Sequence, residues 1–223
     1  MVDLSSRSTD PEQLDLGVAE EEAVRSLRDL RFVNRWLGGR RSLVRALSPW
    51  LRQAGRLSLL DVGCGAADVP AWLAGTARGR LLAVGLDLKL AHLRQVPADV
   101  AGVLADVRAL PFRPGAFDLV TANLFLHHFD GSQVSELLRC LHALARRALV
   151  VSDLRRARVP YLFGRLCFPL IFRSRVSVAD GLLSIRRGFT ETELAAAFRE
   201  AGIHQVQIER CFPYRLLAVA ARP

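Results

Sequence analysis

The sequence lacks the residue patterns that would mark a zinc protein, a disulfide-linked protein or a membrane-spanning protein. Its cysteines are few and far apart, with no C-x-x-C pair and no paired Cys/His spacing: Cys64, Cys140, Cys167 and Cys211. Neither a metal site nor a disulfide is therefore expected, and free thiols suit a reducing compartment. The longest apolar stretch, residues 159–172, contains an arginine and two prolines, whereas a membrane span needs about 20 apolar residues. The polar, acidic N-terminus "MVDLSSRSTDPEQLDLG" has no signal-peptide core, so we expect a cytoplasmic protein.

Lysine is almost absent, and arginine supplies nearly all of the positive charge behind the formal net charge of +9. A protein of this charge could bind nucleic acid, because neutralising phosphates requires basic side chains. The arginines, however, are scattered over residues 25–56, 139–158 and 165–187, and no basic run alternates with aromatics. Nucleic acid is therefore not the favoured partner.

What is present is the composition of a globular protein. The chain has 223 residues, of which 51% are hydrophobic and 24% charged, enough for one domain with an ordinary core. Residues 20–39 begin with three glutamates, end in two glycines and carry apolar side chains at helical spacing, which predicts an amphipathic helix. A second helix is expected over about 42–54. Together these segments form a predicted N-terminal helical cap over residues 1–55.

From residue 56 onward, short apolar runs alternate with helical segments. The expected strands cover residues 56–62, 80–88, 99–107, 116–124 and 148–154. Continuous apolar strands separated by helices predict a mainly parallel sheet with helices on both faces. Thr190 and Glu193 have capping-box spacing at the start of a last helix, and an antiparallel hairpin, about 203–210 and 214–220, follows it. Residues 56–223 are thus predicted to form an α/β domain of the Rossmann-like type with a seven-stranded sheet.

Polar side chains stand at the carboxyl ends of the expected strands, where open α/β sheets bind their ligands. In chain order these residues are Asp61, Asp87, Asp106, Asn123 and Asp153. Asp87 comes about 20 residues after the glycines of "GCGAAD", at the spacing where a carboxylate accepts ribose hydroxyls. This spacing also suits a dinucleotide, but Asp68 stands in place of the third glycine and would repel a diphosphate. The expected ligand has a ribose and no phosphate.

S-adenosylmethionine meets this description. An acid and two loop amides suit its methionine part, a carboxylate suits its ribose, and an acceptor with apolar neighbours suits its adenine. In this order the residues are Asp61; Gly63 and Gly65; Asp87; and Asp106 with Val107 and Leu88. Each aspartate alone could equally cap a helix, but the ordered set favours a cofactor site.

Four segments resemble the motifs of class I methyltransferases. "LLDVGCGAAD" resembles their glycine-rich loop, "VGLDL" their acidic second strand, "ADVRALPF" their adenine segment and "FDLVTANLFLHHF" their fourth strand with its following loop. The similarity covers about residues 57–153 and favours the small-molecule methyltransferases of the ubiquinone and menaquinone biosynthesis type, although Ala67 stands where most members have glycine. The resemblance implies S-adenosylmethionine as cofactor, bound by Asp61, Gly63, Cys64, Gly65, Asp87, Leu88, Asp106, Val107, Asn123 and Leu124.

Two histidines follow the fourth expected strand, in "LFLHHF". Methyl transfer needs an aligned nucleophile, and a phenolic or enolic nucleophile also needs a base. The position of His128 resembles that of the histidine after the fourth strand in this family, so His128 is the favoured base and His127 the second candidate. Alternatively, one of the two packs under the loop or stabilises the cofactor. His92, His142 and His204 are interpreted as surface or packing residues, and metal-independent chemistry is expected.

Residues 155–187 form a connection much longer than the usual 2–6 residues, roughly, of α/β units. The segment is apolar, aromatic and flanked by arginines. We expect a mobile lid over a hydrophobic substrate, while the helix of residues 20–37 closes the other side with Phe32 and Trp36 as packing. A dimer interface and peripheral contact with a membrane are the alternatives, so both monomer and homodimer stay open.

The predicted activity is methyl transfer from S-adenosylmethionine to a small hydrophobic acceptor, with the hydroxyl of a phenolic, enolic or quinol-like polyketide favoured. C-methylation of a quinone or lipid precursor is the main alternative. An RNA or protein methyltransferase is disfavoured, because "NLFL" after the fourth strand lacks the N/D-P-P-Y/F pattern of amino-group methylation. A cofactor-binding protein without catalysis is disfavoured by the complete set of acids.

Overall fold

The computed structural model describes residues 2–222 and contains one seven-stranded sheet in the order β3-β2-β1-β4-β5-β7-β6. The strands are β1 (Leu57–Val62), β2 (Leu81–Asp87), β3 (Val100–Leu104), β4 (Phe117–Asn123), β5 (Ala145–Leu154), β6 (Gln207–Cys211) and β7 (Arg215–Ala221). The first five are parallel, and β7 is antiparallel both to β5 and to β6. The predicted fold class, with its antiparallel C-terminal hairpin, is confirmed.

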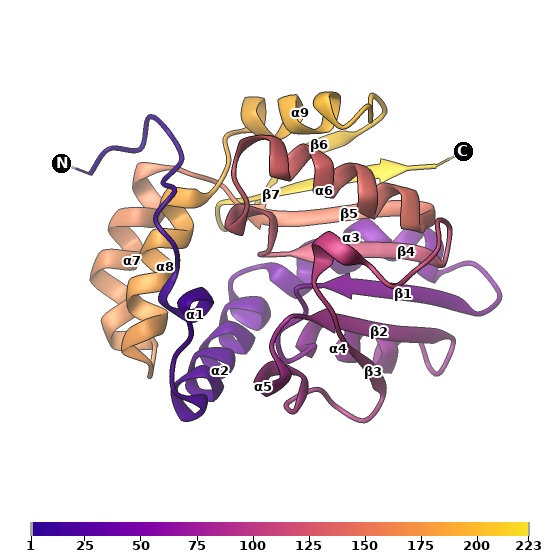
Figure 1. Cartoon of the computed structure of the whole chain (residues 1–223), viewed down its shortest axis with the longest axis horizontal. Helices are drawn as coiled ribbons and strands as arrows, with labels where there is room; N and C mark the ends of the chain where they lie inside the picture. Colours follow the sequence, from indigo (N-terminus) through magenta and orange to yellow (C-terminus); the bar gives the residue numbers. More distant parts are fainter. Residues whose placement is uncertain (1, 223) are drawn as a thin grey trace.

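The helices are α1 (Gln13–Leu16), α2 (Glu20–Trp36), α3 (Gly39–Leu51), α4 (Asp68–Thr76), α5 (Leu90–Leu93), α6 (Gly131–Leu144), α7 (Arg158–Ile171), α8 (Arg175–Arg187) and α9 (Glu191–Glu200), with short 3₁₀ turns η1 (Val107–Ala109) and η2 (Leu126–His128). Helices α6 and α9 cover one face of the sheet, and α3 and α4 cover the other (Figure 1). The strands between them are apolar on both sides, as a parallel sheet covered by helices requires. Within residues 2–222, no helix is long and apolar enough to cross a bilayer.

The central strands bring two loops together. β1 pairs with β2 on one side and with β4 on the other, with Val62 aligned to Ala122. The strand order therefore reverses between β1 and β4, and the segments that leave their carboxyl ends diverge to opposite faces of the sheet. Such a switch point opens a crevice at the sheet edge, where ligands of open α/β proteins bind.

Four helices gather at that edge rather than on the faces of the sheet. In Figure 1 they lie on the left, at the arrowheads of β1, β4 and β5, where α8 packs against α1, α2 and α7. The insertion after β5 is thus a pair of helices, α7 and α8, beside the N-terminal helices. Helix α3, in contrast, buries Leu43 and Leu47 against the sheet itself.

The expectation that Phe32 and Trp36 pack against the site is wrong. Their exposed fractions are 40% and 62%. The buried face of α2 instead carries Ala23 and Leu27, and Phe32 and Trp36, one helical turn apart, point away from it. The side of α2 that faces the cavity carries Leu27, Val33 and Asn34 in place of the two aromatic residues.

Candidate active site

The glycine-rich loop after β1 is shaped by left-handed backbone conformations. Gly63 and Gly65 have φ values of 62° and 55°, which glycine adopts without strain. A Cβ atom on Gly63 would lie 2.0 Å from the ring of Phe125, so this position also needs glycine for space. Ala67 has φ of 51° and is fully buried, which explains why glycine is the usual residue there; this chain keeps the loop with alanine.

Asp61 lies beneath the loop and is almost completely buried. The hydroxyl of Thr121 donates a hydrogen bond of 2.6 Å to its Oδ1. Burial raises the pKa of the Asp61 carboxyl to about 7, against the effect of that hydrogen bond, and the charges of Asp68 and Asp87 raise it further. A cation placed beside Asp61 would favour the ionised form, as the ammonium group of a methionine moiety would.

Asp87 ends β2 and connects it to the loop. Its Oδ2 accepts a hydrogen bond of 2.8 Å from the backbone N–H of Gly65, and its Oδ1 accepts one of 2.9 Å from Lys89. The buried Nδ1 of His92 lies 3.2 Å from Oδ1 but forms no hydrogen bond. His92 is therefore a packing residue, and Asp87 fixes the position of Gly65.

A cavity of about 430 Å³ opens between the loop and the helices at the sheet edge. We call the part near Asp61, Gly63 and Gly65 its loop end, and the part near His127 and His128 its histidine end. The predicted site residues that line this cavity are Asp61, Gly63, Cys64, Gly65, Asn123, Leu124, His127 and His128. Burial raises the pKa of the Cys64 thiol, so Cys64 meets the cavity as a neutral side chain.

The remaining predicted cofactor residues lie outside this cavity, on the β2 and β3 side of the loop. Asp106 caps η1 and binds the side chain of Arg108, while Leu88 is exposed and Val107 is buried. The structure therefore divides the predicted cofactor residues into two groups, and only one of them faces the cavity with the histidines.

His127 lies in η2, directly after β4, and is held from below by the end of β5. Its Nδ1 is 2.7 Å from Oδ1 of Asp153, whose exposed fraction is 0%. Burial alone would lower the pKa of His127, but Asp153 and Glu12 raise it to about 10. At neutral pH the imidazole of His127 therefore carries a proton on both nitrogens and cannot act as a base.

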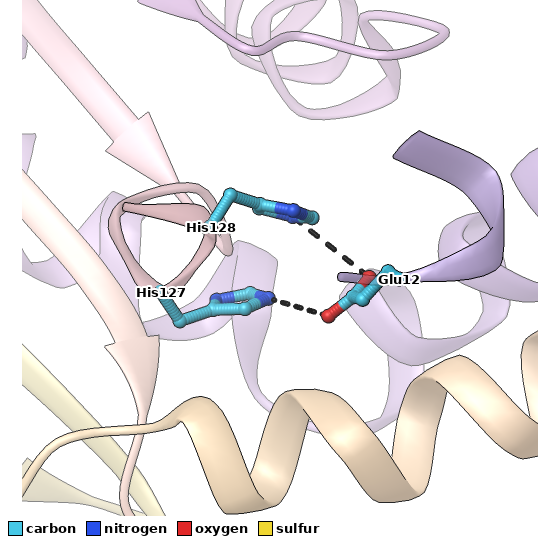
Figure 2. Close-up of side chains that lie close together, drawn as sticks. All are labelled: Glu12, His127 and His128. Carbon is cyan, nitrogen blue, oxygen red and sulfur yellow. Dashed lines mark ion pairs between the residues drawn. The ribbon is translucent and has the colours of Figure 1, made fainter. Parts of the chain in front are cut away.

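Glu12 is a residue of this site that sequence reasoning missed. Its carboxylate is buried and lies 3.4 Å from Nε2 of His127 and 4.0 Å from Nε2 of His128. Figure 2 shows both imidazoles projecting from the same turn toward this carboxylate. The bond with His127 keeps the pKa of Glu12 low, although burial acts in the opposite direction. No local pattern marks Glu12, because its partners are more than one hundred positions away along the chain.

His128 is stacked on His127, with ring centroids 4.4 Å apart. It is more accessible, with 21% of its side chain exposed, and its Nδ1 lies 2.7 Å from Oδ2 of Asp15. The imidazoles thus have the same arrangement: a carboxylate at Nδ1 and Glu12 on the Nε2 side. The ligand atoms of Glu12, His127 and His128 lie within 4.8 Å of one another and could hold a metal ion.

The segment that carries Glu12 is fixed in place by α8 and by arginines. Asp180 accepts hydrogen bonds of 2.9 Å from the backbone N–H groups of Gln13 and Leu14. Arg187 and Arg7 both donate to the backbone carbonyl of His127, at 2.8 and 3.2 Å. These contacts make the histidine end a rigid junction of η2, α8 and the N-terminal segment.

A polar network runs along the α2 side of the cavity. Asn34 donates to Asp68 at 3.1 Å and accepts from Asn123 at 3.0 Å. Arg40 pairs with Asp68 at 3.2 Å, so the carboxylate in the third glycine position is neutralised within the protein. Arg215 donates to Asn123 at 3.1 Å and is fully buried. The network ties the N-terminal helices to the loop and to the ends of β4 and β7.

Helix α7 has two apolar faces with different surroundings. Phe163 and Phe168 face the cavity, where the ring of Phe168 also packs at a tilt against that of Phe172. Leu166 and Leu170 point away from it, with exposed fractions of 74% and 85%. The expected lid segment therefore supplies an apolar wall and leaves a second apolar face uncovered in the single chain.

Two sequence comparisons bear on this site. Residues 60–148 match the family model described as "Methyltransferase domain". This range extends from β1 to β5 and includes the loop, Asp87, Asp106 and both histidines. The search of curated proteins found no match.

The fold is similar to solved methyltransferase structures. A protein from Nostoc punctiforme described as an O-methyltransferase has a TM-score of 0.59 and 20% identity; the alignment covers 83% of this chain, which spans 57% of that protein's length. Magnesium protoporphyrin IX methyltransferase from Synechocystis, with bound SAH, has a TM-score of 0.58 and 19% identity, covering 84% of this chain and 83% of that one. The plantazolicin methyltransferase BpumL has a TM-score of 0.68 and 13% identity, covering 91% and 97%.

At these identities the structural similarities show the fold alone, and the domain match is confined to residues 60–148. The fold has the parallel strands, the glycine-rich loop after β1 and the antiparallel β7 that the sequence motifs predicted. The chain thus has the fold of solved methyltransferases, and its segment from β1 to β5 is similar to the methyltransferase-domain family.

Proposed function

We propose that this enzyme transfers the methyl group of S-adenosylmethionine to a hydroxyl of a small hydrophobic acceptor, phenolic, enolic or quinol-like. One observation carries the proposal: a single cavity of about 430 Å³ reaches from the glycine-rich loop to the paired histidines. Its volume lies within the range of about 300–1,000 Å³ that small-molecule sites occupy. Aromatic side chains of α7 form part of its wall, which favours an apolar acceptor.

The cofactor is proposed to lie across the loop. Its ammonium group would meet Asp61, its carboxylate the loop amides at Gly63 and Gly65, and its ribose Asp87. The adenine amine would meet Asp106 in a shallow site between Leu88 and Val107, outside the apolar cavity. Cys64, Asn123 and Leu124 complete the proposed contacts. In this placement the sulfonium methyl group would point into the cavity, toward the histidine end.

The proposed chemistry is an in-line displacement. The acceptor oxygen attacks the methyl carbon, the sulfur–carbon bond breaks, and its electron pair stays on the sulfur of S-adenosylhomocysteine. Alignment of the reacting atoms at about 3–3.5 Å supplies much of the acceleration. His128 is the proposed base for the acceptor's proton, because it lines the cavity and is the more accessible of the two histidines. His127, already protonated, would position His128 by stacking and through Glu12.

The same proposal includes three further points. The enzyme is of the ubiquinone and menaquinone biosynthesis type, it resides in the cytoplasm, and its N-terminal helical cap ends at residue 55. The similar structures named for magnesium protoporphyrin IX and plantazolicin support an acceptor of low molecular weight. The uncovered face of α7 supports either a homodimer or contact with a membrane. C-methylation is the alternative outcome, since a carbon nucleophile that is already ionised would not need the base.

The test is transfer of a labelled methyl group. Purified protein is incubated with methyl-labelled S-adenosylmethionine and an organic extract of metabolites, and the products are separated by mass. The proposal predicts a labelled organic-soluble product with one added methyl group, and less of it from the variant Asp87→Ala when the cofactor is below saturation. Labelling of RNA or protein in place of the extract would contradict the proposed acceptor class, and absence of cofactor binding would contradict the proposal as a whole.

A further inference from the structure

Both histidines of the site have their Nδ1 atoms turned toward a carboxylate. Nδ1 of His127 lies 2.7 Å from Asp153, and Nδ1 of His128 lies 2.7 Å from Asp15. A carboxylate at Nδ1 fixes the orientation of an imidazole and directs Nε2 to the ion, as in carboxylate–histidine–metal arrangements. A metal ion that binds there displaces the Nε2 proton of His127, because an imidazole coordinates in its neutral form. The two Nε2 atoms both face the carboxylate of Glu12 (Figure 2).

The spacing of these atoms is close to that of a metal site. Zinc binds imidazole nitrogen and carboxylate oxygen at about 2.0–2.2 Å, so two ligands at a tetrahedral angle are about 3.4 Å apart. Nε2 of His127 and Oε1 of Glu12 are separated by 3.4 Å, and Nε2 of His128 and Oε2 of Glu12 by 4.0 Å. All three ligand atoms lie within 4.8 Å of one another. A shift of the partly exposed His128 ring by about 1 Å would bring all three ligand atoms to the spacing of a metal site.

The ligands are held by a second layer of contacts. Ser184 of α8 donates a hydrogen bond of 2.5 Å to Glu12, and Asp180 anchors the two residues that follow Glu12. The ligands therefore come from the N-terminal segment and η2, and α8 holds the N-terminal segment in place. Because Glu12, His127 and His128 also line the cavity, an ion bound by them would have coordination positions open to a small molecule.

We propose that Glu12, His127 and His128 form a binding site for a divalent transition-metal ion whose open positions face the acceptor. Two imidazoles and one carboxylate favour zinc, cobalt, iron(II) or manganese over calcium and magnesium, which prefer oxygen ligands. Three protein ligands with open positions are the arrangement of catalytic rather than structural sites. The expected metal-independent chemistry would then not hold, because Glu12 supplies the acid ligand that the sequence around Asp153 lacks.

The role of the ion rests on the proposed function and changes one part of it. An acceptor hydroxyl bound to the metal would release its proton to solvent, since a bound cation lowers the pKa of its oxygen ligand. The metal-bound oxygen would then attack the methyl carbon with an electron pair, and the sulfur–carbon bond would break. In the metal-loaded enzyme Nε2 of His128 is a ligand, and the ion replaces it in preparing the nucleophile.

The experiment measures metal binding directly and does not require the acceptor. All proteins carry Cys140→Ser, which removes an exposed thiol. The full-length protein is stripped of metal with a chelator and titrated with Co²⁺, while visible absorption and heat are recorded. About one ion per chain is expected to bind with the d–d bands of nitrogen and oxygen ligands, and to be displaced by Zn²⁺. Glu12→Gln and His128→Ala are each expected to weaken binding at least about tenfold, and Asp15→Asn by about 10–100-fold.

The matched control is His204→Ala, which removes an exposed histidine remote from the cluster and is expected to bind Co²⁺ as the parent protein does. Circular dichroism and S-adenosylmethionine affinity show whether each variant is folded. If Glu12→Gln or His128→Ala does not fold, Asp15→Asn is the deciding variant, because it leaves all three ligands in place. Absence of Co²⁺ binding, or equal binding by the parent protein, Glu12→Gln and Asp15→Asn, would overturn the inference and leave an ion-pair cluster. Cofactor binding and methyl transfer by metal-free protein would then still support the proposed function, with His128 as base.

Discussion

The two ends of the cavity are constructed in different ways. The loop end is made of backbone: left-handed conformations at Gly63 and Gly65, and an amide held by Asp87. The histidine end is made of side chains from segments distant along the chain, with Glu12 facing His127 and His128. A backbone site leaves a local pattern in the sequence, because particular positions need glycine. A site of charged side chains does not, because any acid close in space can serve.

The largest effect is expected at the histidine end. Replacing His128 by alanine should lower turnover by about 10²–10⁴, the usual contribution of an acid–base group, while S-adenosylmethionine affinity stays nearly unchanged. Steady-state rates and calorimetry on the same preparation measure both. A loss below threefold would mean that alignment alone drives the reaction, and a parallel loss of affinity would mean that the two ends are not separate.

The buried ion pair beneath His127 is expected to dominate the stability of that end. Asp153→Asn removes the countercharge of a protonated, buried imidazole, and breaking such pairs costs about 3–5 kcal/mol. Urea unfolding of the cofactor-free protein gives the free energy. Asp15→Asn serves as the control, because Asp15 is half exposed and exposed pairs contribute at most about 1 kcal/mol. Equal, small losses for both variants would show that burial of Asp153 does not strengthen its pairing.

At the loop end, Asp87→Ala is expected to reduce S-adenosylmethionine affinity at least tenfold. The change removes two proposed hydrogen bonds to the ribose, each about 1.5–3 kcal/mol because the acceptor is charged, and frees the amide of Gly65. Calorimetry measures the affinity, and circular dichroism checks the fold. Unchanged affinity would assign Asp87 to the structure of the loop alone.

A smaller, pH-dependent effect is expected from Asp61, whose pKa burial raises to about 7. In the cofactor-free protein the raised value means that stability from this group is greatest at low pH and is lost as pH rises toward 7. A cofactor ammonium reverses the preference, so affinity should increase between about pH 6 and 8. Calorimetry at several pH values should show this rise in the parent protein and a flat profile in Asp61→Asn. A rise that persists in the variant would place the titrating group elsewhere.

The sequence predicted the loop end and the sheet far better than it predicted the histidine end. The mainly parallel sheet follows from apolar runs alternating with helices, and the loop follows from Gly63 and Gly65, because both depend on local constraints. The partners of His127 could not be predicted, since Glu12 lies in an N-terminal segment with only one short helical turn, positioned by Asp180 of α8. The misplaced Phe32 has a different cause: its size suggested packing, but it lies on the side of α2 opposite to the buried face.

The most direct test of the central claim, that one cavity joins the cofactor to the histidines, is a crystal structure with bound S-adenosylhomocysteine. We expect the ribose to lie against Asp87, the sulfur to lie in the cavity, and the side of the sulfur that bears the methyl group in S-adenosylmethionine to face His128. A sulfur atom directed away from the histidines, or separated from them by the N-terminal segment, would contradict this claim.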